Sequence, residues 1–106
     1  MDVVLAIGMQ RARTLAEIAQ LKHRHFTPHS WTNGIGVLAN LHVAAGVGGG
    51  PFFEFPYDPP GWTPERRDFM LADPVRVDSE GDLEIPARPG LGIELDEDAI
   101  DRWRIT

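Results

Sequence analysis

The sequence predicts an α/β fold built on a small parallel sheet. In the first half of the chain, short apolar segments rich in β-branched or aromatic residues alternate with stretches of helical spacing. Alternation of this kind, with connections of only a few residues, is typical of right-handed crossovers between parallel strands. From Leu71 onward the pattern changes to period-two alternation. We therefore expect a strand–helix segment over residues 1–70 and a carboxyl-terminal appendage over residues 71–106.

The first expected strand is Val3–Ala6, an uninterrupted apolar run that follows Asp2. Runs of this kind are typical of strands that are buried on both faces of a parallel sheet. A helix is expected next, over Met9–His25, because apolar residues recur there at helical spacing and Thr14–Glu17 matches a capping box.

Phe26–Thr27 is the second expected strand, and it ends at Pro28 because proline has no backbone N–H to donate. The polar turn that follows places His29 just past the carboxyl end of a strand, where α/β folds put ligands and catalytic groups. A single histidine in such a turn is also compatible with a structural or surface role. An apolar helical run over residues 37–45 comes next.

Gly46–Pro51 breaks this helix. A phosphate-binding interpretation of the glycines is disfavoured because no helix amino terminus follows them, so a flexible turn is expected. The third expected strand, Phe52–Phe55, carries a single carboxylate, Glu54, among aromatic residues. A charge in an apolar strand is costly unless it is paired, protonated or placed at the strand's end.

The remaining elements are short. Tyr57–Pro64 is a proline-rich loop that leads into a short helix. The alternating residues of Val75–Ile85 predict a hairpin around a turn at Ser79–Asp82. A last helix is expected over Glu97–Trp103, capped by Asp96.

Composition disfavours several classes of function. The formal net charge of −6 argues against nucleic acid as a partner, since a polyanion requires a basic surface. No apolar run approaches the ~18 residues of a membrane span, and the amino terminus lacks a signal-peptide pattern. The absence of cysteine excludes disulfides, thiolate metal sites and a cysteine nucleophile. These features fit a cytoplasmic protein, which is the location we expect.

Four sequence pieces, in this order, resemble the carboxyl-terminal portion of an enolase-superfamily enzyme of the mandelate racemase and muconate lactonizing type. They are Asp2-Val3-Val4 with its following Gly8 turn, Thr27-Pro28-His29, Phe53-Glu54-Phe55 and the closing signature Pro86–Asp96. The resemblance covers essentially the whole chain. It implies an α/β fold that corresponds to about strands 6–8 of a (β/α)8 barrel. It also implies that residues 71–106 form a β-hairpin appendage, which packs on the capping domain in the full-length family.

The resemblance further implies a catalytic trio at the ends of the sixth, seventh and eighth barrel strands: Asp2, His29 and Glu54. In mandelate-racemase-like members the histidine moves the proton on the carbon beside a carboxylate, the aspartate orients it, and the acidic residue hydrogen-bonds the substrate carboxylate. A carboxylate on one ring nitrogen fixes the histidine tautomer and improves the other nitrogen as a base. The neighbouring phenylalanines should favour protonated Glu54. The plain alternatives are that Asp2 only caps the chain's start and that Glu54 only faces solvent.

The same resemblance implies Mg²⁺, held in the full-length family by acidic residues on strands three to five, and a lysine base on strand two. Neither precedes Asp2 in this sequence, so we expect no magnesium bound by this chain alone and no turnover by it. The implied substrates are small carboxylates or acid sugars, for a dehydratase, racemase or cycloisomerase. Expected partners are further copies of the chain or a complementary amino-terminal fragment. The alternative is a non-catalytic truncated fragment, or a self-associating or split-enzyme subunit.

Three aromatic residues, Trp31, Tyr57 and Trp62, are expected to line the mouth of the substrate pocket. A metal cluster formed by His23, His25 and His29 is disfavoured, because no acidic or thiolate partner is placed near them.

Overall fold

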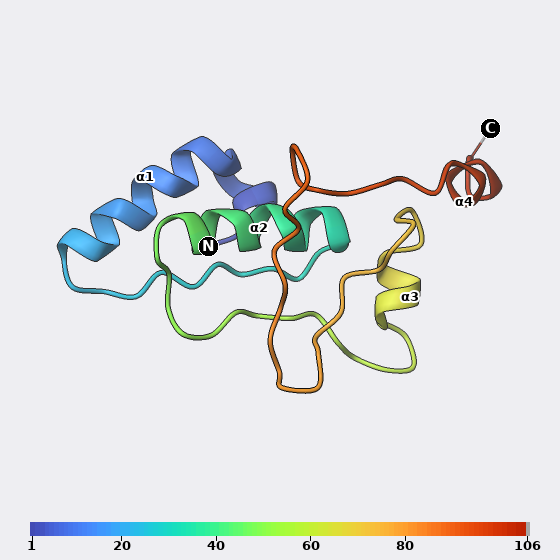
Figure 1. Ribbon diagram of the computed structural model, residues 1–106. Helices are drawn as coiled ribbons and strands as arrows, with labels where there is room; N and C mark the ends of the chain where they lie inside the picture. Colours follow the sequence, from blue (N-terminus) through green and yellow to red (C-terminus); the bar gives the residue numbers. More distant parts are fainter. Residues whose placement is uncertain (106) are drawn as a thin grey trace.

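The computed structural model describes residues 1–105. Its elements are η1 (Val3–Ile7), α1 (Gly8–Leu21), α2 (Gly34–Gly46), α3 (Pro64–Arg67) and α4 (Glu97–Arg102). Figure 1 shows α2 at the centre, with η1 and α1 against it and α4 at the far end of the molecule. None of the helices in this described part is long and apolar enough to cross a lipid bilayer.

α2 is the buried centre of the fold, and most of its side chains are inaccessible to water. α1 packs through small residues, because Ala12 and Ala16 are fully buried in a cluster with Val3, Phe26 and Val43. The larger apolar side chains of α1 point elsewhere and are exposed, namely Leu15, Ile18 and Leu21. The helix therefore buries its alanine face and leaves its leucine-rich face open.

The strand expected at Val3–Ala6 is wrong, because these residues form η1, a short π-helical turn. The Asp2 carboxylate caps it by accepting hydrogen bonds from the N–H groups of Val4 and Leu5, at 2.8 and 3.1 Å. Gly8, with φ of 77°, closes the turn by donating its N–H to the Val3 carbonyl. Leu5 is 72% exposed, so the run is not buried on two faces. An apolar run without periodicity does not distinguish strand from helix.

The segments expected as the second and third strands, Phe26–Thr27 and Phe52–Phe55, are not assigned to strands within residues 1–105. They nevertheless lie side by side and run in the same direction (Figure 1). The Gly50 N–H donates to the Phe26 carbonyl at 3.0 Å, and the Ser30 hydroxyl donates to the Glu54 carbonyl. Both bonds join residues at the same sequence separation, as parallel pairing requires. The parallel direction is present, whereas a regular ladder is not.

The glycine turn allows this close approach. A Cβ atom on Gly49 would lie 2.9 Å from the Phe26 carbonyl oxygen, and one on Gly50 would lie 2.9 Å from the Thr27 hydroxyl oxygen. Contacts this short exclude a side chain, so the two backbones can only meet where glycine is present. The glycine segment Gly46–Pro51, which was expected only as a flexible turn, therefore also packs closely against Phe26 and Thr27.

The strand pair expected over Val75–Ile85 is wrong, although its turn forms. The Asp78 N–H donates to the Asp82 carbonyl at 3.0 Å. The arms are not assigned as strands within residues 1–105, and the backbone of Val75 is bonded to another segment: its N–H donates to Asp68 at 2.9 Å and its carbonyl accepts from Arg67 at 2.7 Å. The antiparallel contact of this region instead joins Leu71 with Leu95.

Arg67 and Asp68, at the end of α3, form an ion pair with fully buried side chains. The guanidinium donates to both carboxylate oxygens of Asp68, at 2.7 and 2.6 Å. It also donates to the Pro56 carbonyl at 2.9 Å and lies 4.5 Å over the Phe55 ring. With the Val75 contacts, the pair fastens the segment after Glu54 to the appendage.

We predict that Asp68→Ala destabilises the fold by about 3–5 kcal/mol, because it leaves the Arg67 charge buried without its partner. The matched control is Arg13→Ala, which removes an exposed ion pair with Glu17 and should cost less than about 1 kcal/mol. Urea denaturation of both variants measures the difference. Equal stability of the Asp68 variant and the wild type would contradict the structural role of the pair.

Candidate active site

His29 lies where three segments of the chain meet. Its Nδ1 atom is 3.4 Å from Oδ2 of Asp2, and its Nε2 atom is 4.0 Å from Oε2 of Glu54. The His29 backbone N–H also donates to the Met1 carbonyl at 2.9 Å. The structure therefore brings the three residues of the expected trio together, with one carboxylate near each ring nitrogen. Because the His29 side chain is 53% exposed, its ring is accessible to a small molecule.

Asp2 is the buried member of this group, with 7% exposure. Burial raises the pKa of its carboxyl, but hydrogen bonds from the N–H groups of Leu5 and Val4 and from the His29 and Asn40 side chains outweigh this effect. The pKa is therefore lowered from its ordinary value of 3.8. Asp2 is held as a carboxylate beside the imidazole, which is the form that can fix a histidine tautomer.

Glu54 is held by Ser30, the fully buried residue that follows His29. The Ser30 N–H donates to Oε2 of Glu54 at 2.6 Å, while the Ser30 hydroxyl donates to the Glu54 carbonyl. The expected apolar enclosure is only partial, because Phe52 is 81% exposed and the Glu54 side chain is 40% exposed. The second oxygen, Oε1, is left for a further contact.

Sequence reasoning missed the functional contacts of Ser30 and Asn40. Ser30 was expected only as part of a polar turn. Asn40 is fully buried on α2, where its Oδ1 atom accepts the Val3 N–H at 2.9 Å. The signal was present in the sequence, since an asparagine inside an otherwise apolar helical run is a buried polar group that needs a partner.

The three aromatic residues expected at the pocket mouth are dispersed. Trp31 is 45% exposed, two positions beyond His29. Tyr57 lines a shallow pocket of about 350 Å³ together with Phe55 and Arg76. Trp62 is partly buried and its backbone pairs with Asp58. Their expected substrate role remains a prediction.

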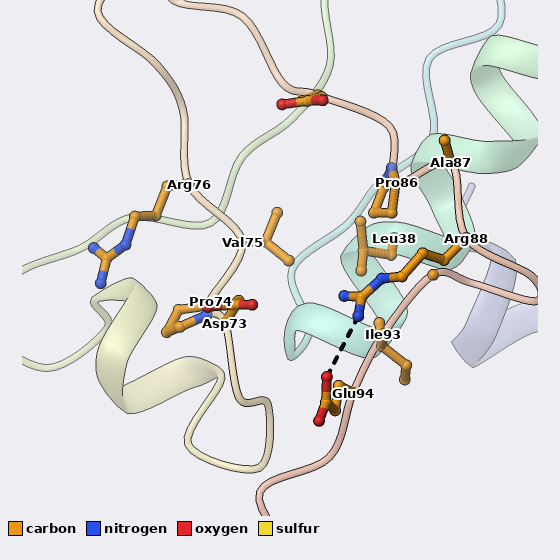
Figure 2. A pocket seen from close by; sticks show the side chains of 12 residues that line it. Leu38, Asp73, Pro74, Val75, Arg76, Pro86, Ala87, Arg88, Ile93 and Glu94 are labelled. Carbon is orange, nitrogen blue, oxygen red and sulfur yellow. Dashed lines mark hydrogen bonds and ion pairs between the residues drawn. The ribbon is translucent and has the colours of Figure 1, made fainter.

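A separate cleft of about 410 Å³ opens between the two unpaired arms of the appendage (Figure 2). Leu38 of α2 lies in its lining, together with apolar residues of both arms. An ion pair between Arg88 and Glu94, 3.4 Å apart, lies in the lining, on the side formed by residues 86–94 (Figure 2). None of the expected catalytic or aromatic residues lines it.

The described residues do not fit a divalent metal. Within residues 1–105, no three histidine, aspartate or glutamate side chains are grouped to hold an ion. Asp2 and Glu54 lie near different nitrogens of the His29 ring, and each carboxylate already accepts backbone N–H groups. Magnesium requires several oxygen ligands that converge in near-octahedral geometry, which this arrangement does not offer.

Comparison with known proteins gives a consistent result. The model of the enolase C-terminal domain-like family matches residues 1–99. Muconate cycloisomerase 1 from Rhodococcus opacus is 31% identical over 99 residues, which cover 91% of this chain and 25% of that protein. D-xylonate dehydratase from Haloferax volcanii is 30% identical over 94 residues, or 89% of this chain and 22% of that protein.

Among solved structures, a protein from Pseudovibrio sp. assigned to the mandelate racemase/muconate lactonizing enzymes is similar, with a TM-score of 0.79 and 27% identity. The match covers 99% of this chain and 27% of that one. The chain thus spans about a quarter of the length of the relatives that it matches.

We predict that Asp2 stabilises the fold in a pH-dependent way. Its lowered pKa means that the stabilisation is complete above 3.8, the value expected in the unfolded chain, and is lost as the pH falls through the lower folded value. Asp2→Asn should therefore be less stable than the wild type at neutral pH, and the difference should shrink in acid. Urea denaturation at several pH values measures this.

The control for this measurement is Leu41→Ala, a buried apolar truncation on α2 that should cost about 2–5 kcal/mol at every pH. A difference between the wild type and Asp2→Asn that stays constant from neutral pH to acid would contradict the prediction.

Proposed function

The chain belongs to the enolase C-terminal domain-like family. It matches the carboxyl-terminal portion of mandelate racemase and muconate lactonizing members. On that premise we propose that it supplies one half of an active site that moves the proton on a carbon beside a carboxylate. The observation that carries the proposal is the placement of His29 between Asp2 and Glu54. The other half of the site lies outside this chain.

In this proposal His29 is the general acid/base. Asp2 at Nδ1 favours the neutral tautomer that carries its hydrogen there, which leaves the Nε2 lone pair free to accept a proton. A substrate carbon would approach Nε2, whose neighbour across 4.0 Å is Glu54. Because the Ser30 N–H engages one oxygen of Glu54, the other oxygen, carrying a proton, is available to donate a hydrogen bond to the substrate's carboxylate.

The substrate class proposed is a small carboxylate or acid sugar. Relatives named as D-xylonate dehydratase, arabinonate dehydratase and D-galactarolactone cycloisomerase support this class. Dehydration, racemisation and cycloisomerisation all begin with or include transfer of a proton beside a carboxylate, so the trio is compatible with each.

The proposal assigns the metal and the second base to the missing half. The superfamily generally depends on Mg²⁺, and the residues described in this chain do not fit the ion. We therefore propose that the isolated chain has negligible activity. Activity would require a barrel portion supplied by another chain or by a longer form of this protein.

Complementation tests this function. The Haloferax volcanii D-xylonate dehydratase, shortened by the portion that this chain matches, would be mixed with the chain, D-xylonate and Mg²⁺ in ²H₂O. We expect α-proton exchange, followed by NMR, only in the mixture. His29→Asn should lower the rate about 10²–10⁴-fold, since it removes the general base. Exchange by the chain alone would contradict the requirement for a second half.

The matched control for complementation is His25→Asn, which makes the same substitution at an exposed histidine outside the trio. It should leave the exchange rate of the mixture unchanged. A His29 variant as active as the His25 variant would overturn the catalytic assignment.

A second candidate function, a self-associating non-catalytic chain, is favoured by the exposed apolar side chains. Leu5, Leu21 and Phe52 are between 72% and 82% exposed. Large apolar side chains this exposed are candidates for contacts with another chain. This candidate and the first are compatible, because a complementary fragment would also cover these side chains.

We predict that the purified chain sediments above its monomer mass of 11.8 kDa. Phe52→Glu and Leu21→Glu should shift the equilibrium toward monomer, because each places a charge where an apolar contact is needed. Ser79→Glu, at an exposed polar position in the appendage turn, is the control and should have no effect. A wild-type chain that remains a compact monomer at high concentration would contradict self-association.

A further inference from the structure

We propose that Asn40 is a positioning residue that sets the orientation of Asp2 toward His29. The inference rests on the function proposed above and adds a residue to that site. Asn40 lies in the middle of α2 and is inaccessible to water, so it cannot touch a bound substrate. Its effect therefore has to pass through Asp2.

The geometry begins with the two peptide groups that flank Asp2. The carbonyl before it, from Met1, accepts the backbone N–H of His29 at 2.9 Å. The N–H after it, from Val3, donates to Oδ1 of Asn40 at 2.9 Å. Asp2 is thus held on one side by the residue that it orients and on the other side by Asn40. Removal of the Asn40 contact would free the peptide group that follows Asp2, while the peptide group before it would stay bonded to His29.

The two oxygens of the Asp2 carboxylate are divided between two tasks. Oδ1 accepts the N–H groups of Val4 and Leu5, and Oδ2 faces Nδ1 of His29 at 3.4 Å. The first N–H of this turn, that of Val3, is taken by Asn40. Because Asn40 satisfies that donor, Asp2 can cap the turn with one oxygen and keep the other directed at the imidazole.

Asn40 is itself fixed by its amide group. Its Nδ2 atom donates to the Gly36 carbonyl at 3.1 Å, and the whole residue is inaccessible to water. An amide can donate to a carbonyl and accept from an N–H at once, whereas a carboxylate can only accept and an aliphatic side chain can do neither. Asn40 is also among the groups that lower the pKa of Asp2, which agrees with its placement beside that carboxylate.

The test is the tautomer of the neutral His29 ring, read from its ¹⁵N chemical shifts in the full-length chain at alkaline pH. We expect the wild type to carry its hydrogen mainly on Nδ1, facing Asp2. Asn40→Ala should lower the ratio of the Nδ1–H to the Nε2–H form by about tenfold. This factor corresponds to loss of the hydrogen bond from the His29 Nδ1–H to the charged Asp2 carboxylate. Asp2→Asn should lower the same ratio at least as much.

Two further variants keep the test decisive. Leu41→Ala removes a buried side chain from the adjacent position of α2 and should leave the tautomer ratio unchanged, so a fall in the ratio is not a general effect of lower stability. Asn40→Gln retains the amide but moves its oxygen by one methylene. It should lower the ratio too, and it serves where Asn40→Ala does not fold.

The outcomes separate this inference from the proposed function. A wild-type ring without a preference for Nδ1–H would overturn the Asp2–His29 pair, and the proposed function with it. A preference that Asp2→Asn abolishes but that both Asn40 variants retain would leave the pair intact and overturn the role of Asn40. Loss of the preference in the Asn40 and Asp2 variants, with retention in Leu41→Ala, supports the proposal.

Discussion

The buried ion pair of Arg67 and Asp68 is the constraint on which the rest of the structure depends. A guanidinium and a carboxylate removed from water are tolerated only when nearly all of their hydrogen bonds are made. Here those bonds reach outward, to the Pro56 carbonyl and to both backbone groups of Val75. A Cβ atom on Gly34 would lie 2.6 Å from the Asp68 carboxyl carbon, so the pair also abuts the start of α2. Three distant segments are fixed by one pair.

The candidate site is held together in the same way, by side chains that bond to backbone. Asn40 bonds Val3, Asp2 caps the turn that follows it, and the Ser30 hydroxyl bonds the Glu54 carbonyl. In a regular sheet, the hydrogen bonds between neighbouring backbones would hold these segments in place. Since no strand is assigned anywhere in residues 1–105, the positions of Asp2, His29 and Glu54 depend on individual polar contacts. Each contact therefore matters more than a single ladder bond would.

The sequence predicted the order of the parts better than their secondary structure. The family, the helix over most of Met9–His25 and the meeting of Asp2, His29 and Glu54 were all accessible from motifs and spacing. The conformation of Val3–Ala6 could not be predicted in this way, because its helical turn depends on a cap by Asp2. The contacts of the Val75 backbone with Arg67 and Asp68 were not accessible either. Local patterns do not encode such side-chain contacts between distant segments.

α2 connects the two polar networks. Its amino-terminal end lies against Asp68, and its middle carries Asn40, with apolar side chains buried between and around them. Arg67 holds Pro56, two residues beyond Glu54, while Asn40 holds Val3, the residue after Asp2. Asn40 ties the residue after Asp2 directly to α2, whereas Arg67, at the end of α3, holds the segment after Glu54 and reaches α2 only through Asp68 packed against Gly34. The two carboxylates that flank His29 are therefore held by separate polar contacts, one network on α2 and one at the end of α3, and these networks share only the packing of Asp68 against the start of α2.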